Sequence, residues 1–77
     1  MTKLQQTILN IVEASQGIKG ATLEAQLSTN FLTMDMKEIE NVIEGMIIDG
    51  EIVEVQYKIP DYGLKSFILP KGTHVGS

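Results

Sequence analysis

The chain has 77 residues, enough for one small domain, and its ten acidic residues outnumber its six basic ones, for a formal net charge of -4. It has no cysteine and one histidine, His74, so disulfide staples, thiolate metal sites and histidine-rich metal clusters are excluded. No stretch approaches the roughly 18 apolar residues of a membrane span, and the N-terminus lacks a signal-peptide pattern. We therefore expect a soluble intracellular domain, in the cytoplasm or nucleus, with no cofactor, no metal and no membrane partner.

All six basic residues are lysine. Arginine is better suited than lysine to bidentate recognition of guanine and of phosphate. The negative net charge also opposes the long-range attraction that speeds proteins onto nucleic acid. Both features count against sequence-specific DNA binding unless the lysines gather on one surface.

Residues 3–15 are predicted to form a first helix. Thr2 and Gln5 fit a capping box at its start, and Gly17 is placed to end it in the left-handed conformation. Leu9 and Ile11 widen its apolar side, which fits either packing on the other elements or a homodimer contact. The apolar stripe at helical spacing consists of Leu4, Ile8, Ile11 and Val12.

A weaker second helix is predicted over residues 18–28. Leu23 and Leu27 stand four positions apart and give it one apolar side. Its start is ambiguous from the sequence, because Gly20 and Thr22 each fit the N-cap. A short polar connection is expected to follow this helix.

That connection is predicted over residues 28–30, with Phe31 and Leu32 as buried anchors beneath it. The third helix is predicted to begin with an acidic capping box made by Asp35 and Glu38, where carboxylates suit the positive helix N-terminus. One side of this helix is apolar and carries Met36, Ile39, Val42, Ile43, Met46 and Ile47.

The third helix is predicted to end at Asp49–Gly50. After it, apolar residues no longer recur at helical spacing but at every second position, which predicts a half-buried strand. Residues 60–63 form a turn signal, because proline fixes its early backbone and glycine permits a positive φ at its end. Residues 64–69 are the return strand of a β-hairpin, closed by Pro70, and residues 71–77 are expected to be a flexible tail. The alternation sets Val53, Val55, Tyr57 and Ile59 against Glu54, Gln56 and Lys58.

Three groups of positions carry a family resemblance: Ile18, Leu23 and Leu27; Ile39, Ile43, Met46 and Ile47; and the junction from Ile47 to Val53. Their spacing, and the order of three helices before a hairpin, resembles the winged helix-turn-helix domain over residues 3–70. The resemblance implies an α+β, three-helix winged-helix domain over residues 1–70 with a C-terminal two-stranded β-hairpin as the wing. The connection from Ser28 to Met34 departs from the family pattern by its length.

The resemblance also implies that the third helix enters a DNA major groove and that the hairpin touches the phosphate backbone. Lys37 and Asn41, on the exposed side of this helix, suit contacts to guanine or phosphate and to adenine. On the hairpin, Lys58, Tyr62 and Lys65 suit phosphate contact and base stacking, or the lysines protect an exposed edge strand from aggregation. Five acids on or beside the helix oppose insertion: Asp35, Glu38, Glu40, Glu44 and Asp49.

The same side of the third helix offers a protein-recognition surface of Glu40, Glu44, Gly45 and Ile48. An exposed helical glycine costs about 1 kcal/mol relative to alanine, so Gly45 either admits a close partner backbone or is simply tolerated. Ile48 is either an interface anchor or folds under the hairpin.

We therefore expect a non-catalytic binding module, an accessory or regulatory factor in transcription, replication or phage-type regulation, that recognises a partner protein through the acidic side of the third helix. The alternative is a DNA-binding protein that uses Lys37, Asn41 and the hairpin lysines, with duplex or single-stranded DNA as its partner. An enzyme is not expected, because no histidine base, serine elbow or glycine-rich phosphate loop accompanies the carboxylates. No role is expected for His74.

Overall fold

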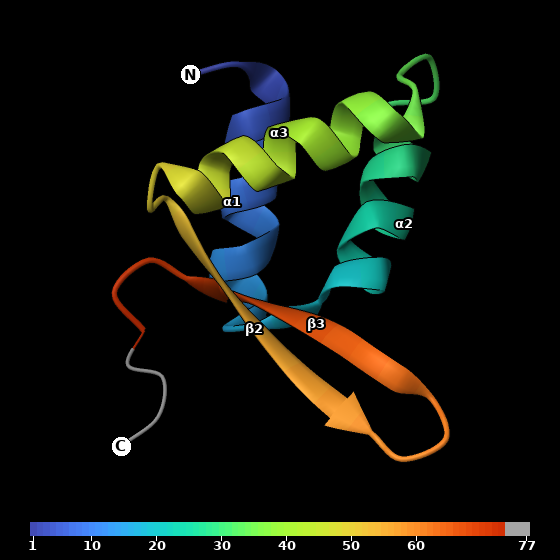
Figure 1. The fold of residues 1–77 in the computed structure, drawn as a ribbon. Helices are drawn as coiled ribbons and strands as arrows, with labels where there is room; N and C mark the ends of the chain where they lie inside the picture. The colour runs from blue at the N-terminus through green and yellow to red at the C-terminus, as the bar shows by residue number, and fades with distance from the viewer. Residues whose placement is uncertain (74–77) are drawn as a thin grey trace.

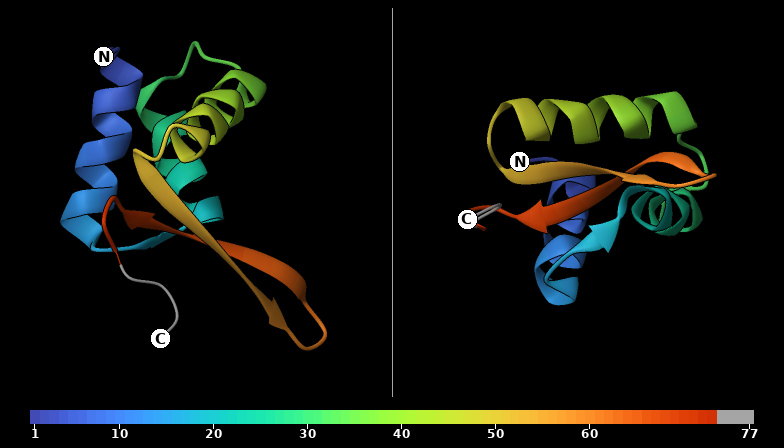
Figure 2. Two further views of the ribbon diagram at one scale, coloured as in Figure 1. Left: turned by 60° about the vertical axis from the view of Figure 1, so that its left-hand side comes forward. Right: turned by 60° about the horizontal axis from the view of Figure 1, so that its bottom comes forward.

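The computed structural model describes residues 1–73, which form an α+β fold with three helices and one three-stranded antiparallel sheet (Figure 1). The strand order is β1-β3-β2, so the expected hairpin is part of a larger sheet than the two strands predicted. The turn of this hairpin projects beyond the helices (Figures 1 and 2). In chain order the elements are α1 (Lys3–Ser15), β1 (Ile18–Lys19), α2 (Gly20–Asn30), α3 (Met36–Ile48), β2 (Ile52–Ile59) and β3 (Gly63–Pro70).

The first helix has the predicted bounds and the predicted capping box. The backbone N–H of Gln5 donates to Thr2 Oγ1 at 3.2 Å, and the backbone N–H of Thr2 donates to Gln5 Oε1 at 2.9 Å. The left-handed residue at its end is Gln16, with φ 57°, and not Gly17 as predicted. Gly17 has φ 133°, and a Cβ there would lie 2.6 Å from Phe67 Cε1, so both its backbone conformation and the Phe67 side chain on β3 favour glycine.

The second helix begins later than predicted because its first two expected residues form a strand. Ile18 pairs with Ile68 and Lys19 pairs with Phe67, which adds β1 to the free edge of β3. Backbone pairing with a distant strand therefore overrides the local helical spacing. Gly20 is the first helical residue, after Lys19 as an N-cap without a side-chain hydrogen bond.

The connection before α3 also differs from the prediction. Residues 28–30 belong to α2, which leaves only residues 31–35 as the connection. Phe31 packs partly buried against the core, but Leu32 is 83% exposed and is not the predicted anchor. The structure thus shortens the segment that departed from the winged-helix pattern.

The third helix follows the prediction in its bounds and in most of its packing, but Met36, predicted on its apolar side, is exposed in the first turn and does not pack against the core. Ile39, Ile43 and Met46 are buried in the core, while Val42 and Ile47 pack partly buried against it. The capping box does not form, because the Asp35 side chain makes no capping hydrogen bond. The chain leaves the helix through Gly50, whose φ of 81° suits glycine.

The register of the sheet decides which side chains reach the core. Directly paired residues share a face, and Ile52 and Ile68 are buried against the helices. This inner face carries Ile52, Glu54, Gln56, Lys58, Leu64, Ser66, Ile68 and Pro70. The outer face carries Lys65, Phe67 and Leu69 and the apolar residues of the alternating run, Val53, Val55, Tyr57 and Ile59. These four apolar residues of β2 are half-buried, as predicted, but they lie on the side of the sheet away from the core.

The core is apolar, and no polar or charged residue is buried among residues 1–73. None of the helices described has the length and apolar character needed to cross a membrane. After β3 the chain makes a turn, in which the Thr73 hydroxyl donates to the Pro70 carbonyl at 2.7 Å. His74 and the rest of the predicted tail, residues 74–77, lie outside the described residues.

Candidate protein-interaction site

A pocket with a volume of about 400 Å³ lies between the exposed side of α3, the middle of α2 and the inner face of β2. Four carboxylates and three isoleucines line it, and no lysine does. We call it the acidic pocket, and its residues are Glu24, Glu40, Ile43, Glu44, Ile47, Ile48 and Glu54.

Three different elements supply the carboxylates. Glu24 comes from α2, Glu40 and Glu44 come from α3 one helical turn apart, and Glu54 comes from β2. The sequence places Glu40 and Glu44 on the same side of one helix. Only the packing of α2 and β2 against α3 brings Glu24 and Glu54 to the same site.

The surroundings of the pocket change the ionisation of Glu24. Partial burial raises the pKa of its carboxyl above the ordinary glutamate value, and the negative charge of Glu40 raises this pKa further. The pocket thus concentrates like charges that favour a cation, because a positive group would offset the repulsion between Glu24 and Glu40.

Three of the four predicted protein-interaction residues line the acidic pocket: Glu40, Glu44 and Ile48. Ile48 is 78% exposed, so it does not fold under the hairpin. Gly45 lies on the same helix without lining the pocket, and a Cβ there would meet nothing within 4 Å. The contributions of Glu24 and Glu54 could not be predicted from the sequence, because their positions depend on the crossing of α2, α3 and β2.

The predicted DNA-contact residues fall in two separate places. Lys37 and Asn41 are exposed on α3, whereas Lys58, Tyr62 and Lys65 are exposed on the projecting hairpin. None of them lines the acidic pocket, which lies between α3 and β2. A duplex that touches both groups must therefore pass close to the carboxylates of the pocket.

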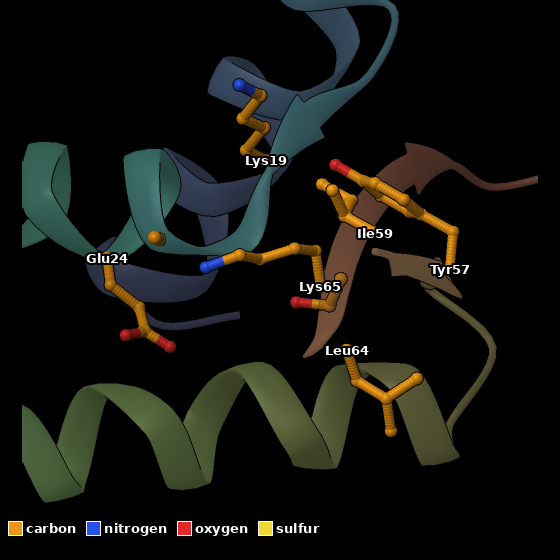
Figure 3. Close-up of a pocket in the computed structure, with 8 residues that line it drawn as sticks. Lys19, Glu24, Tyr57, Ile59, Leu64 and Lys65 are labelled. Carbon is orange, nitrogen blue, oxygen red and sulfur yellow. The ribbon is translucent and has the colours of Figure 1, made fainter. Parts of the chain in front are cut away.

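A second concavity of about 390 Å³ lies beside β3 and the start of α2 (Figure 3). We call it the mixed-charge pocket; its lining is Lys19, Ala21, Glu24, Tyr57, Ile59, Leu64, Lys65 and Ser66. Figure 3 shows the Lys65 side chain reaching from β3 toward α2, with Tyr57 and Ile59 close together on the other side. Its two cations and one carboxylate make it electrostatically different from the acidic pocket.

The four carboxylates of the acidic pocket do not form a metal site. Among residues 1–73, no group of three or more histidine, cysteine, aspartate or glutamate side chains is placed to hold a metal ion. The carboxylates are therefore spread around a surface rather than gathered on one point, which suits contacts to several cations of a larger ligand.

The widened apolar side of α1 is explained by packing within the chain. Leu9 and Ile11 lie partly buried against the core. Of the two interpretations of this stripe, the structure therefore favours packing on the other elements over a dimer contact.

Comparisons with protein-family models, with curated proteins and with solved structures found no match to this chain.

Proposed function

We propose that the chain is a non-catalytic binding module, and that its acidic pocket recognises a basic, amphipathic segment of a partner protein. The observation that carries the proposal is the lining of the pocket, which consists of four glutamates and three isoleucines with no lysine among them. Such a surface complements lysines or arginines that flank an apolar side chain.

The two kinds of side chain in the pocket have different tasks in this proposal. The carboxylates speed the encounter with a basic partner and set its orientation. Ile48, largely exposed at the edge of the pocket, supplies apolar area that a partner side chain covers on binding. A helical partner with basic and apolar residues on one side can contact the carboxylates and cover Ile48 at the same time.

The test is titration of the protein with a fluorescent amphipathic peptide made of leucine and lysine, read by anisotropy and by amide chemical shifts. We expect shifts confined to α3, the middle of α2 and β2. The change Glu44→Lys should weaken binding about tenfold, in the range seen for charged pairs across an interface.

Two controls make this test specific. The change Glu38→Lys alters the same charge on the same helix outside the pocket lining, so it should weaken binding less than Glu44→Lys does. A peptide with glutamate in place of lysine should not bind. Equal effects of the two helix variants, or shifts located elsewhere, would contradict the proposal.

We also propose the winged-helix arrangement for this α+β fold, and with it an intracellular role as an accessory or regulatory factor in transcription, replication or phage-type regulation. The order of the elements supports it, with three helices ahead of the β2–β3 hairpin. The shortened connection between α2 and α3 supports it further, because the longer predicted connection was the departure from the family pattern.

A second candidate function is DNA binding, favoured by the exposed hairpin tip. Tyr62 is 74% exposed there, and Lys58 and Lys65 lie on either side of the turn. The test is a salt titration with duplex and single-stranded DNA. Tight binding near physiological salt, with a log-log slope equivalent to several phosphates, would favour this function over protein recognition.

A further inference from the structure

The strand β2 lies at an open edge of the sheet. It pairs with β3 along all eight of its residues, and no other strand among residues 1–73 pairs with it. Its second edge therefore presents backbone N–H and C=O groups in an extended row. An edge of this length is a template for pairing with another chain.

The sequence of β2 is complementary to itself about Gln56. In an antiparallel pair of two such strands, a two-fold axis at Gln56 sets Glu54 of each copy opposite Lys58 of the other. The two opposite-charge pairs lie on the inner face, to which both residues belong. On the outer face the same register sets Val53 opposite Ile59 and Val55 opposite Tyr57, so every pair is apolar.

Other two-fold registers lose this match. An axis at Glu54 or at Lys58 places like charges opposite each other, which is destabilising in a sheet. An axis at Val55 or at Tyr57 leaves both charged residues opposite uncharged ones. Only the axis at Gln56 pairs each charge with its opposite.

We propose that the chain forms a homodimer through antiparallel pairing of two β2 edges about a two-fold axis at Gln56. The two sheets join into one six-stranded sheet, and the contact is isologous, as closed dimers require. Glu54 of each acidic pocket is then engaged by Lys58 of the second copy, which leaves Glu24, Glu40 and Glu44 for a partner protein.

The first test measures molar mass by sedimentation equilibrium over a concentration series, with circular dichroism as the folding check. We expect the native chain to reach twice 8.5 kDa. Each single change, E54K or K58E, should raise the dimer Kd about tenfold or more, because it turns two attractive pairs into two repulsive ones. The double variant E54K/K58E should restore the dimer.

The matched controls are E13K and K3E, which make the same charge changes at exposed positions of α1 and should leave the dimer Kd unchanged. A chain that stays monomeric over the whole series overturns the proposal. So does a dimer that the single changes leave intact, or one that the double variant fails to restore.

A second test locates the axis. The chain has no cysteine, so Q56C introduces a single thiol opposite its own copy. Directly opposed residues of an antiparallel pair have Cα atoms about 4.5–5.5 Å apart, within the range for a disulfide. We expect Q56C to form a disulfide-linked dimer under mild oxidation, and Q26C, exposed on α2, to form no intermolecular disulfide. Equal cross-linking of both variants overturns the proposed axis.

Discussion

Glu24 and Glu40 belong to different helices but line the same pocket, and the charge of Glu40 adds to burial in raising the pKa of Glu24. Because the raised pKa favours the protonated form in the folded protein, Glu24 opposes folding once it ionises. The free energy of unfolding should therefore fall as the pH rises from the ordinary glutamate pKa to the raised one.

The change Glu24→Gln should remove this dependence. We expect the variant to be more stable than the native chain above the raised pKa and to gain nothing below the ordinary one. Urea unfolding at a series of pH values measures the difference. As a check on the cause, Glu40→Gln should lower the pKa of Glu24 in a carbon-13 titration while leaving the part due to burial. A stability difference independent of pH would contradict this account.

Gly45 and Gly17 should respond in opposite ways to alanine. At Gly45 a Cβ meets nothing within 4 Å, so Gly45→Ala should stabilise the protein by about 1 kcal/mol through helix propensity. At Gly17 a Cβ would meet Phe67 and Leu69, and the φ of 133° is strained for alanine, so Gly17→Ala should cost about 1–3 kcal/mol.

Thermal unfolding checks both changes, since about 1 kcal/mol corresponds to roughly 4–8 °C in a domain of this size. If Gly45→Ala also weakens binding of the leucine–lysine peptide, the partner approaches the helix backbone closely. Unchanged binding would show that this glycine is tolerated rather than required.

Two leucines near the end of α2, one within the helix and one just after it, test the burial assignments. Leu27 is fully buried, so Leu27→Ala should cost about 2–5 kcal/mol. Leu32 is 83% exposed, so Leu32→Ala should change the free energy of unfolding by less than about 0.5 kcal/mol. Urea unfolding of both variants measures the contrast, and equal losses would mean that Leu32 is buried in solution.

Charge reversal in the acidic pocket should separate the two candidate functions. The double change Glu40→Lys with Glu44→Lys removes two carboxylates from α3 and adds two cations. It should abolish binding of the basic peptide while raising the affinity for duplex DNA, because phosphate is no longer repelled. If the native chain already binds DNA more tightly than this variant does, the carboxylates take part in DNA recognition.

The elements that the sequence predicts well are those with a strong local signal. The bounds of α1 and α3 follow from the spacing of their apolar residues, and the hairpin follows from the alternation that precedes a proline and glycine turn. The acidic side of α3 is equally local, since Glu40 and Glu44 are one turn apart. These features depend on neighbours within a few positions.

What the sequence did not predict depends on distant contacts. The pair Ile18 and Lys19 has helical spacing, but it forms a strand because β3 offers an edge to it. The inner face of β2 is defined by Ile52, one residue before the alternating run, because the register with β3 places Ile52 and Ile68 on the helix side. Glu24 joins the acidic pocket only through the crossing of two helices.

The pairing of Ile18 with Ile68 has a consequence for synthesis of the protein on the ribosome. A nascent chain that has not yet reached residue 68 has all three helices but lacks a core residue that closes them against the sheet. Such an intermediate leaves apolar helix surface exposed to chaperones and proteases. Folding of the domain formed by residues 1–73 therefore has to wait until residue 68 has been translated.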